Sequence, residues 1–244
     1  MNKREYYYPV IGYVLLLVVV WLLSWLVDIT ATFLDTDFGI CSLVSSEGVR
    51  WVMRSGIAAL NNIAWGTVML TLAAYGLLQG AGITRVLKHI SQRVRLTKME
   101  TRSIFIALFA LLLYSLVLYV LTLSRWNVLL GITGTFENSP FVSGLPILIF
   151  FGVLILALVY GFMYGNYRSA IDVVTSMGNT FTKFVPALIA LIPASATMAS
   201  VLYTGVFELM NLSDKEIWVM EFVFYSIPFM HIIFGNKNSD IENL

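Results

Sequence analysis

The chain has little charge, little histidine and almost no cysteine, and each shortage excludes a class of protein. Only 12% of its 244 residues are charged, against about a quarter in soluble domains. A single cysteine, Cys41, excludes an internal disulfide and a cysteine-rich metal cluster. The two histidines, His89 and His231, have no metal-binding spacing such as HExxH, and no GxSxG or phosphate-loop motif occurs. We therefore expect no enzyme activity, no metal, no cofactor and no nucleic-acid partner.

Charge is absent altogether from five long stretches, and a sixth contains only Glu221. The composition is 59% hydrophobic and the mean hydropathy is +0.83. A helix crosses a bilayer with about 20 mainly apolar residues, and each stretch is about that long or longer. This pattern predicts an all-α polytopic membrane protein with about six transmembrane helices plus interfacial helices, in a single membrane domain of residues 1–244. The expected spans lie near residues 9–28, 56–82, 103–124, 144–167, 184–207 and 217–235.

The first apolar stretch is as long as a full span and is not followed by a small-residue cleavage pattern. We therefore expect it to remain as a transmembrane helix and not to be removed as a signal peptide.

The positive charges gather on one predicted side of the membrane. Eleven of the 15 Lys and Arg residues fall before the first span or after the second, fourth and sixth spans. Basic loops stay in the cytoplasm, so both termini should be cytoplasmic in a bacterial inner membrane. The densest basic segment, 85–102, has apolar residues at helical spacing and is either a topology signal or a lipid site. On the outer side, the segment near 46–56 should form an interfacial helix.

Polar side chains inside the apolar stretches are the candidate substrate-binding residues, because burying such groups in lipid is costly. They are Asn61 and Asn62 at the start of the second span, Gln79 near its end, and Glu221 in the last span. Glu221 either couples a proton or ion or faces outer-leaflet water, about one turn into its helix. The amides either bind substrate or bond to neighbouring helices.

The string YGxxxG occurs twice, ending the second and fourth spans, with Gly76 and Gly80 in one copy and Gly161 and Gly165 in the other. Glycines four residues apart form a flat strip that lets two helix backbones approach closely. We interpret these four glycines as helix-packing residues and not as a binding site.

Two segments are similar to a known family. Residues 42–83 carry the string EGVRW ahead of a long helix, and residues 139–177 carry a YG helix end, a charged turn and Asp-Val-Val. In order and character these blocks resemble the AbgT family of p-aminobenzoyl-glutamate transporters. The resemblance implies a transporter of a small organic anion such as an aminobenzoyl-glutamate-like compound, acting as a homodimer in the lipid bilayer.

The chain also departs from the family pattern. Where the family has an acidic pair, this sequence has Gln79 and Gly80, and the region 102–137 is one aliphatic span with a short loop. Longer family members carry polar re-entrant hairpins in such regions, which place helix ends at a midplane site. A second function therefore stays open, a non-transporting scaffold or accessory subunit that keeps part of the AbgT frame and binds another membrane protein.

Overall fold

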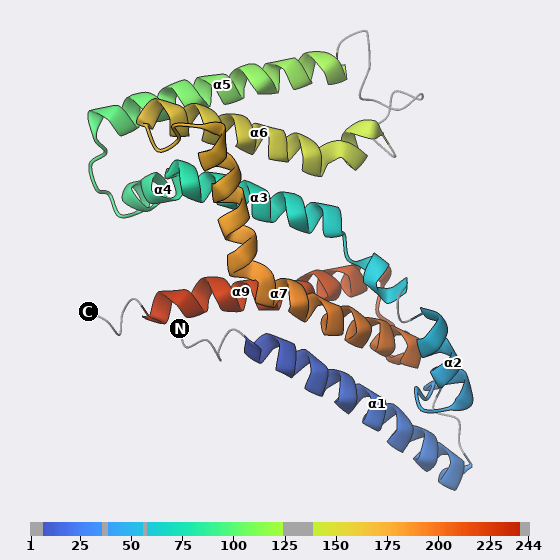
Figure 1. The fold of residues 1–244 in the computed structure, drawn as a ribbon. Helices are drawn as coiled ribbons and strands as arrows, with labels where there is room; N and C mark the ends of the chain where they lie inside the picture. The colour runs from blue at the N-terminus through green and yellow to red at the C-terminus, as the bar shows by residue number, and fades with distance from the viewer. Residues whose placement is uncertain (1–6, 36–38, 56–57, 124–138, 240–244) are drawn as a thin grey trace. The chain divides into compact units, whose positions relative to one another are not determined.

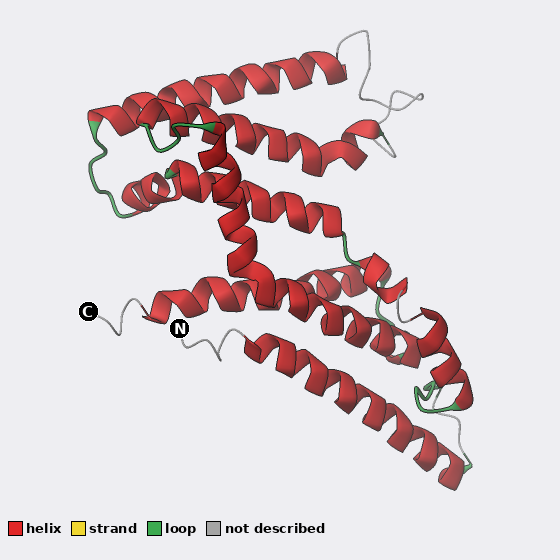
Figure 2. Cartoon of the chain, viewed as in Figure 1, coloured by secondary structure: helices red, strands yellow, loops and turns green. Residues whose placement is uncertain are grey.

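The computed structural model describes residues 7–35, 39–55, 58–123 and 139–239, and these residues form helices joined by short connections (Figure 1). Figure 2 shows that no strand occurs among the described residues. The chain divides into two compact units, one made of Met1–Ala64 with Phe184–Leu244 and the other of Trp65–Lys183. We call them unit 1 and unit 2.

Unit 1 contains helix α1 (Tyr8–Leu34), helix α2 (Ser46–Ser55) and a 3-10 turn, η2 (Ala58–Asn62). It also contains the C-terminal half of α7 (Ala170–Thr204), the short α8 (Val206–Leu209) and α9 (Asp214–Ser239). Its core is formed by Tyr13 of α1 and Ala190 and Ala194 of α7, with Phe224 and Tyr225 of α9 packed against them. The two alanines leave room for the aromatic rings, so the first helix and the last pack on α7.

Unit 2 contains α3 (Trp65–Ala81), α4 (Ile83–Ser91), α5 (Lys98–Leu123), α6 (Pro140–Tyr164) and the N-terminal half of α7. Helix α6 packs between α3 and α5 (Figure 1). The buried core lies at the end of the unit where α3 and α6 finish, and includes Leu77, Val86, Ala157, Tyr160 and Tyr167. The outer faces of α5 and α6 remain apolar and exposed, as expected for helices in contact with lipid.

Among the described residues, five helices are long and apolar enough to cross a membrane, and the pair α3 and α4, bent by 74°, raises the number to six if it forms one broken span. The prediction of an all-α polytopic membrane fold is therefore confirmed. The bounds differ in two places from those expected from hydropathy. Helix α3 starts at residue 65 and not near 56, and α7 starts at residue 170 and not near 184. At 35 residues, α7 is longer than the about 20 residues that cross a bilayer core, and it is shared between the two units.

Three of the long helices begin with the same local device, in which a carboxylate accepts a hydrogen bond from the backbone N–H of a Ser or Thr three residues earlier. The oxygen to nitrogen distances are 2.8–2.9 Å. This arrangement satisfies backbone donors that the first turn of a helix leaves unpaired, and it fixes where the helix starts. The pairs are Thr97 with Glu100 before α5, Ser169 with Asp172 before α7, and Ser213 with Glu216 before α9.

Candidate functional site

The C-terminal half of α7 carries a row of buried hydroxyl groups through unit 1. None of the four is more than 3% exposed. The Thr197 hydroxyl donates to the carbonyl of Pro193 at 2.7 Å, and the Ser200 oxygen accepts from the Trp21 indole at 3.4 Å. Because most of these hydroxyls donate to their own helix, they are stable in an apolar environment and keep an acceptor lone pair. The row is Ser195, Thr197, Ser200 and Thr204.

A hydrogen bond from α1 satisfies a backbone group that a proline frees in α9. Pro228 has no N–H, so the carbonyl of Phe224, four residues earlier, lacks its helical donor. The hydroxyl of Tyr13 donates to that carbonyl at 2.6 Å. The Tyr13 ring packs edge-on against Phe224 at 4.8 Å, and both Tyr13 and Pro228 are buried. The proline-interrupted part of α9 is therefore tied to α1 by a specific hydrogen bond.

The stretch before α2 is held by α1 and by the C-terminal end of α7. The Leu43 N–H donates to the Ser24 hydroxyl at 3.2 Å, and the Cys41 N–H donates to the Thr204 carbonyl at 3.1 Å. Trp51 of α2 stacks on Tyr203 with ring centres 4.4 Å apart. These contacts anchor the helix expected at the membrane interface to α1 and to the C-terminal end of α7.

In unit 2, the glycines of α3 allow α7 to pack closely. A Cβ atom on Gly76 would lie 2.6 Å from the Thr180 hydroxyl, and one on Gly80 would collide with the Ser176 side chain. Both hydroxyls bond back to their own helix. The N-terminal half of α7 thus rests directly on the α3 backbone.

The second glycine pair serves a different purpose. A Cβ on Gly161 would collide with the ring of Tyr167, which turns back onto α6. Gly165 ends α6 in a left-handed conformation, with φ of 91°, and has open space around it. The YGxxxG repeat therefore marks two different contacts, a helix crossing in α3 and a helix end in α6.

The turn between α6 and α7 is bonded to the end of α3. The Asn166 amide donates to the Ala81 carbonyl at 2.5 Å, and the Tyr167 hydroxyl donates to the Leu77 carbonyl at 2.8 Å. These bonds supply donors to carbonyls at the end of α3, where helical partners run out. Burial raises the pKa of the Tyr167 hydroxyl, so it remains a donor at physiological pH.

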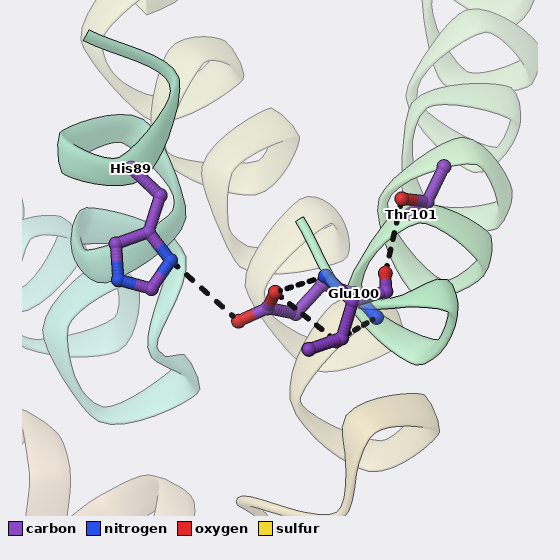
Figure 3. A network of polar contacts seen from close by, with 4 residues as sticks. His89, Glu100 and Thr101 are labelled. Carbon is purple, nitrogen blue, oxygen red and sulfur yellow. Dashed lines mark hydrogen bonds and ion pairs between the residues drawn. The ribbon is translucent and has the colours of Figure 1, made fainter. Parts of the chain in front are cut away.

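The most buried carboxylate described in unit 2 is Glu100, which is 4% exposed (Figure 3). One of its oxygens accepts from the backbone and hydroxyl of Thr97 at 2.8 and 3.1 Å. The other oxygen faces Nδ1 of His89, on α4, at 3.9 Å (Figure 3). The cluster ties the start of α5 to α4, and its geometry is that of a helix cap with a neighbouring imidazole.

The four candidate substrate-binding residues do not come together in any contact among the described residues. Asn61 is exposed in η2, and the side chain of Asn62 lies outside the described residues. Gln79 is exposed on α3, where its carbonyl accepts from the Gly82 N–H at 3.1 Å. Glu221 is half-buried on α9. No group of three or more His, Cys, Asp or Glu residues in the described part of the chain is placed to hold a metal ion.

Two kinds of residue escaped the sequence reasoning although the sequence carries a signal for each. The strings TKME, SAID and SDKE have the Ser or Thr and the acid three residues apart, which is a helix-start signature. Pro228 likewise indicates that the carbonyl of residue 224 lacks its helical N–H donor and needs a donor from another helix. That Tyr13 supplies this donor depends on tertiary packing, and no local pattern points to it.

The sequence of the chain matches a known protein family. Residues 84–214 match the model of the AbgT putative transporter family, which covers α4 to α8 and the first residue of α9. Of the two segments that resemble the family in sequence, 139–177 lies inside the match and 42–83 lies outside it. No curated protein and no solved structure matches the chain. The match spans more than half of the 244 residues and agrees with the multi-pass helical fold, and the chain belongs to the AbgT transporter family.

Proposed function

We propose that this protein carries a small organic anion of the aminobenzoyl-glutamate type across the bacterial inner membrane. The observation that carries the proposal is the family match over residues 84–214. The apolar multi-pass fold is consistent with it, since five to six helices are suited to span a bilayer. Both termini are proposed to be cytoplasmic, because most basic residues lie on that side.

Glu221 is the proposed coupling group. It lies seven residues after the start of α9, about 10 Å along the helix axis, and it is half-buried. An ionisable side chain at such a depth is costly and commonly marks an ion or proton pathway. Asn61, Asn62 and Gln79 are proposed to contact substrate, because amides can donate to a carboxylate and accept from an amine.

A homo-oligomer is part of the same proposal. In the most apolar 18-residue stretches of α5 and α6, only 6% and 11% of the stretch is buried within the chain. These faces are available both to lipid and to a second copy. Chemical crosslinking in native membranes, followed by mass measurement, would detect such a dimer.

Uptake into proteoliposomes tests the proposal. Purified protein is reconstituted, a pH gradient is imposed, and radiolabelled p-aminobenzoyl-glutamate is measured inside the vesicles. We expect gradient-dependent accumulation in the wild type and at least a tenfold loss in Glu221→Gln. The matched control is Glu208→Gln, which removes an exposed acid from α8 and should transport normally. Failure of correctly folded wild type to move this and related aromatic amino-acid conjugates would refute the proposal.

A further inference from the structure

Helix α4 turns sharply away from the axis of α3. The two helices meet at Gly82, which has φ of 87°, and their axes differ by 74°. If α3 crosses the membrane with the average tilt of transmembrane helices, about 20°, α4 lies within about 35° of the membrane plane. An element with this direction runs along the bilayer surface and not across it.

The surface of α4 is divided into two faces that suit such a position. At 100° per residue, one face is apolar and carries Ile83, Val86, Leu87 and Ile90. Ile83 and Val86 are buried in the core of unit 2, with 5% and 1% exposed, whereas Leu87 and Ile90 are 56% and 51% exposed. Arg85 and Lys88 fall on the opposite face, and both are exposed. The helix therefore packs on the bundle by part of its apolar face, and the rest of that face and the basic face stay uncovered.

The positive charge continues beyond α4 and is not neutralised nearby. Four more basic residues follow before α5 is well under way, and all are exposed. Glu100, the acid among them, is buried, capped by Thr97 and directed at His89. No ion pair within 4 Å joins any of the six exposed cations to a carboxylate in the part of the chain that the structure describes. The six are Arg85, Lys88, Arg93, Arg95, Lys98 and Arg102.

We propose that residues 83–102, which we call the basic collar, bind the phosphate groups of anionic phospholipids at the membrane surface. The exposed Leu87 and Ile90 enter the acyl boundary while the guanidinium and ammonium groups reach the headgroups, as in interfacial amphipathic helices. A topology signal needs positive charge only during insertion, whereas the collar keeps unneutralised cations beside exposed apolar side chains in the folded protein. This chemistry selects an anionic lipid surface over a neutral one.

Arg93 offers an independent test of headgroup binding. It lies two residues after the end of α4 and has φ of 55°, a left-handed conformation that glycine adopts without strain, and its N–H donates to the Ile90 carbonyl at 3.1 Å. Arg93→Gly should therefore relieve the backbone while removing one charge. If the side chain serves only as part of the turn, lipid binding will not change, and if it binds headgroups, binding will weaken.

The experiment titrates detergent-solubilised protein with phosphatidylglycerol or phosphatidylcholine and measures bound lipid by native mass spectrometry. We expect phosphatidylglycerol to bind preferentially, and Arg85→Gln with Lys88→Gln to weaken it roughly 25-fold, at about fivefold per charge. The matched control is Arg50→Gln with Arg54→Gln, which removes two exposed charges from the amphipathic α2. The control should bind phosphatidylglycerol as the wild type does. The charge-preserving double variant, Arg85→Lys with Lys88→Arg, should bind phosphatidylglycerol as the wild type does.

Salt and folding controls keep the outcomes distinct. Binding should fall as salt rises from 0.1 to 1 M, because the screening length shrinks from about 10 Å to about 3 Å. Circular dichroism must show equal helix content in all variants. The proposal would be overturned if the Arg85/Lys88 and the Arg50/Arg54 double variants weakened phosphatidylglycerol binding equally, or if the two lipids bound equally well. It would also be overturned if neither Arg93→Gly nor the Arg85/Lys88 double variant changed the binding. Binding of an acidic peptide is measured in the same variants. If the Arg85/Lys88 double variant loses peptide binding while its lipid binding is intact, the collar serves a protein partner and the lipid proposal is wrong.

Discussion

The bond between Tyr13 and the carbonyl freed by Pro228 gives the sharpest test of how unit 1 is held together. Tyr13→Phe keeps the ring that packs on Phe224 and removes only the hydroxyl. The Phe224 carbonyl then has neither its helical donor nor its tertiary one. We expect the free energy of unfolding to fall by about 1–2 kcal/mol.

The magnitude follows from the geometry. A separation of 2.6 Å lies at the short end for a hydroxyl donor, and Tyr13 is 5% exposed. A net hydrogen bond is worth about 0.5–1.5 kcal/mol, and a buried orphan group costs about 1–3 kcal/mol. Bonds between membrane helices average about 0.6 kcal/mol with a maximum near 1.7 kcal/mol, which limits the upper end.

A double-mutant cycle separates this bond from simple packing. Pro228→Ala supplies an N–H to the Phe224 carbonyl, so the Tyr13 hydroxyl becomes redundant. In that background Tyr13→Phe should cost less than about 0.5 kcal/mol. Unfolding is followed by circular dichroism as dodecyl sulfate is added to mixed micelles, where about 1.4 kcal/mol is a tenfold change in the equilibrium constant.

Tyr114→Phe is the matched control. Its hydroxyl donates to the Leu148 carbonyl at 2.9 Å, but residue 152 is a glycine that keeps its N–H within α6. Loss of the hydroxyl therefore leaves no orphan, and the cost should stay below about 1 kcal/mol. Equal costs of Tyr13→Phe with and without Pro228 would refute the reasoning, because the carbonyl would then not depend on Tyr13.

Three further changes test other parts of the molecule. Gly80→Ala should destabilise unit 2 by about 1–3 kcal/mol, because its methyl group collides with α7. The control is Gly178→Ala within helix α7, where the added methyl group meets open space, and this change should be neutral or stabilising by up to about 1 kcal/mol. The same unfolding assay measures both. Thr97→Ala and Glu100→Ala should each cost about 1 kcal/mol and the double variant little more, because both act in one cap; strict additivity would contradict this. The exposed Cys41 should react with a membrane-impermeant maleimide in intact cells, and labelling only after lysis would reverse the proposed orientation.

The sequence predicts the all-helical membrane fold well because lack of charge over about 20 residues is a direct consequence of the bilayer solvent. It predicts their starts less well, since hydropathy ignores caps: α7 begins at its Ser169 and Asp172 cap, well before the uncharged stretch at 184. The second span is shorter than its apolar run because the chain turns at η2 and bends again at Gly82.

The site is harder to predict because its bonds join residues that are distant in sequence. Gly76 and Gly161 hold the same position in the two YGxxxG strings, yet one faces Thr180 and the other faces a tyrosine ring. A repeated motif reports only that bulk is absent, and the neighbour that fills the space is decided by tertiary packing. The substrate residues inferred from polarity, such as Gln79 and Glu221, remain predictions for the transport assay.

The bond from Tyr13 to Phe224 also constrains how the protein is made. Its two ends are 211 residues apart, so α1 enters the membrane long before its partner in α9 has been synthesised. At about 5–20 residues per second, α1 waits roughly 10–40 s with that hydroxyl unmatched. During this interval it depends on lipid, the insertion machinery or transient contacts. Unit 1 therefore closes late, and its N-terminal helix is the part most exposed to quality control when synthesis stalls.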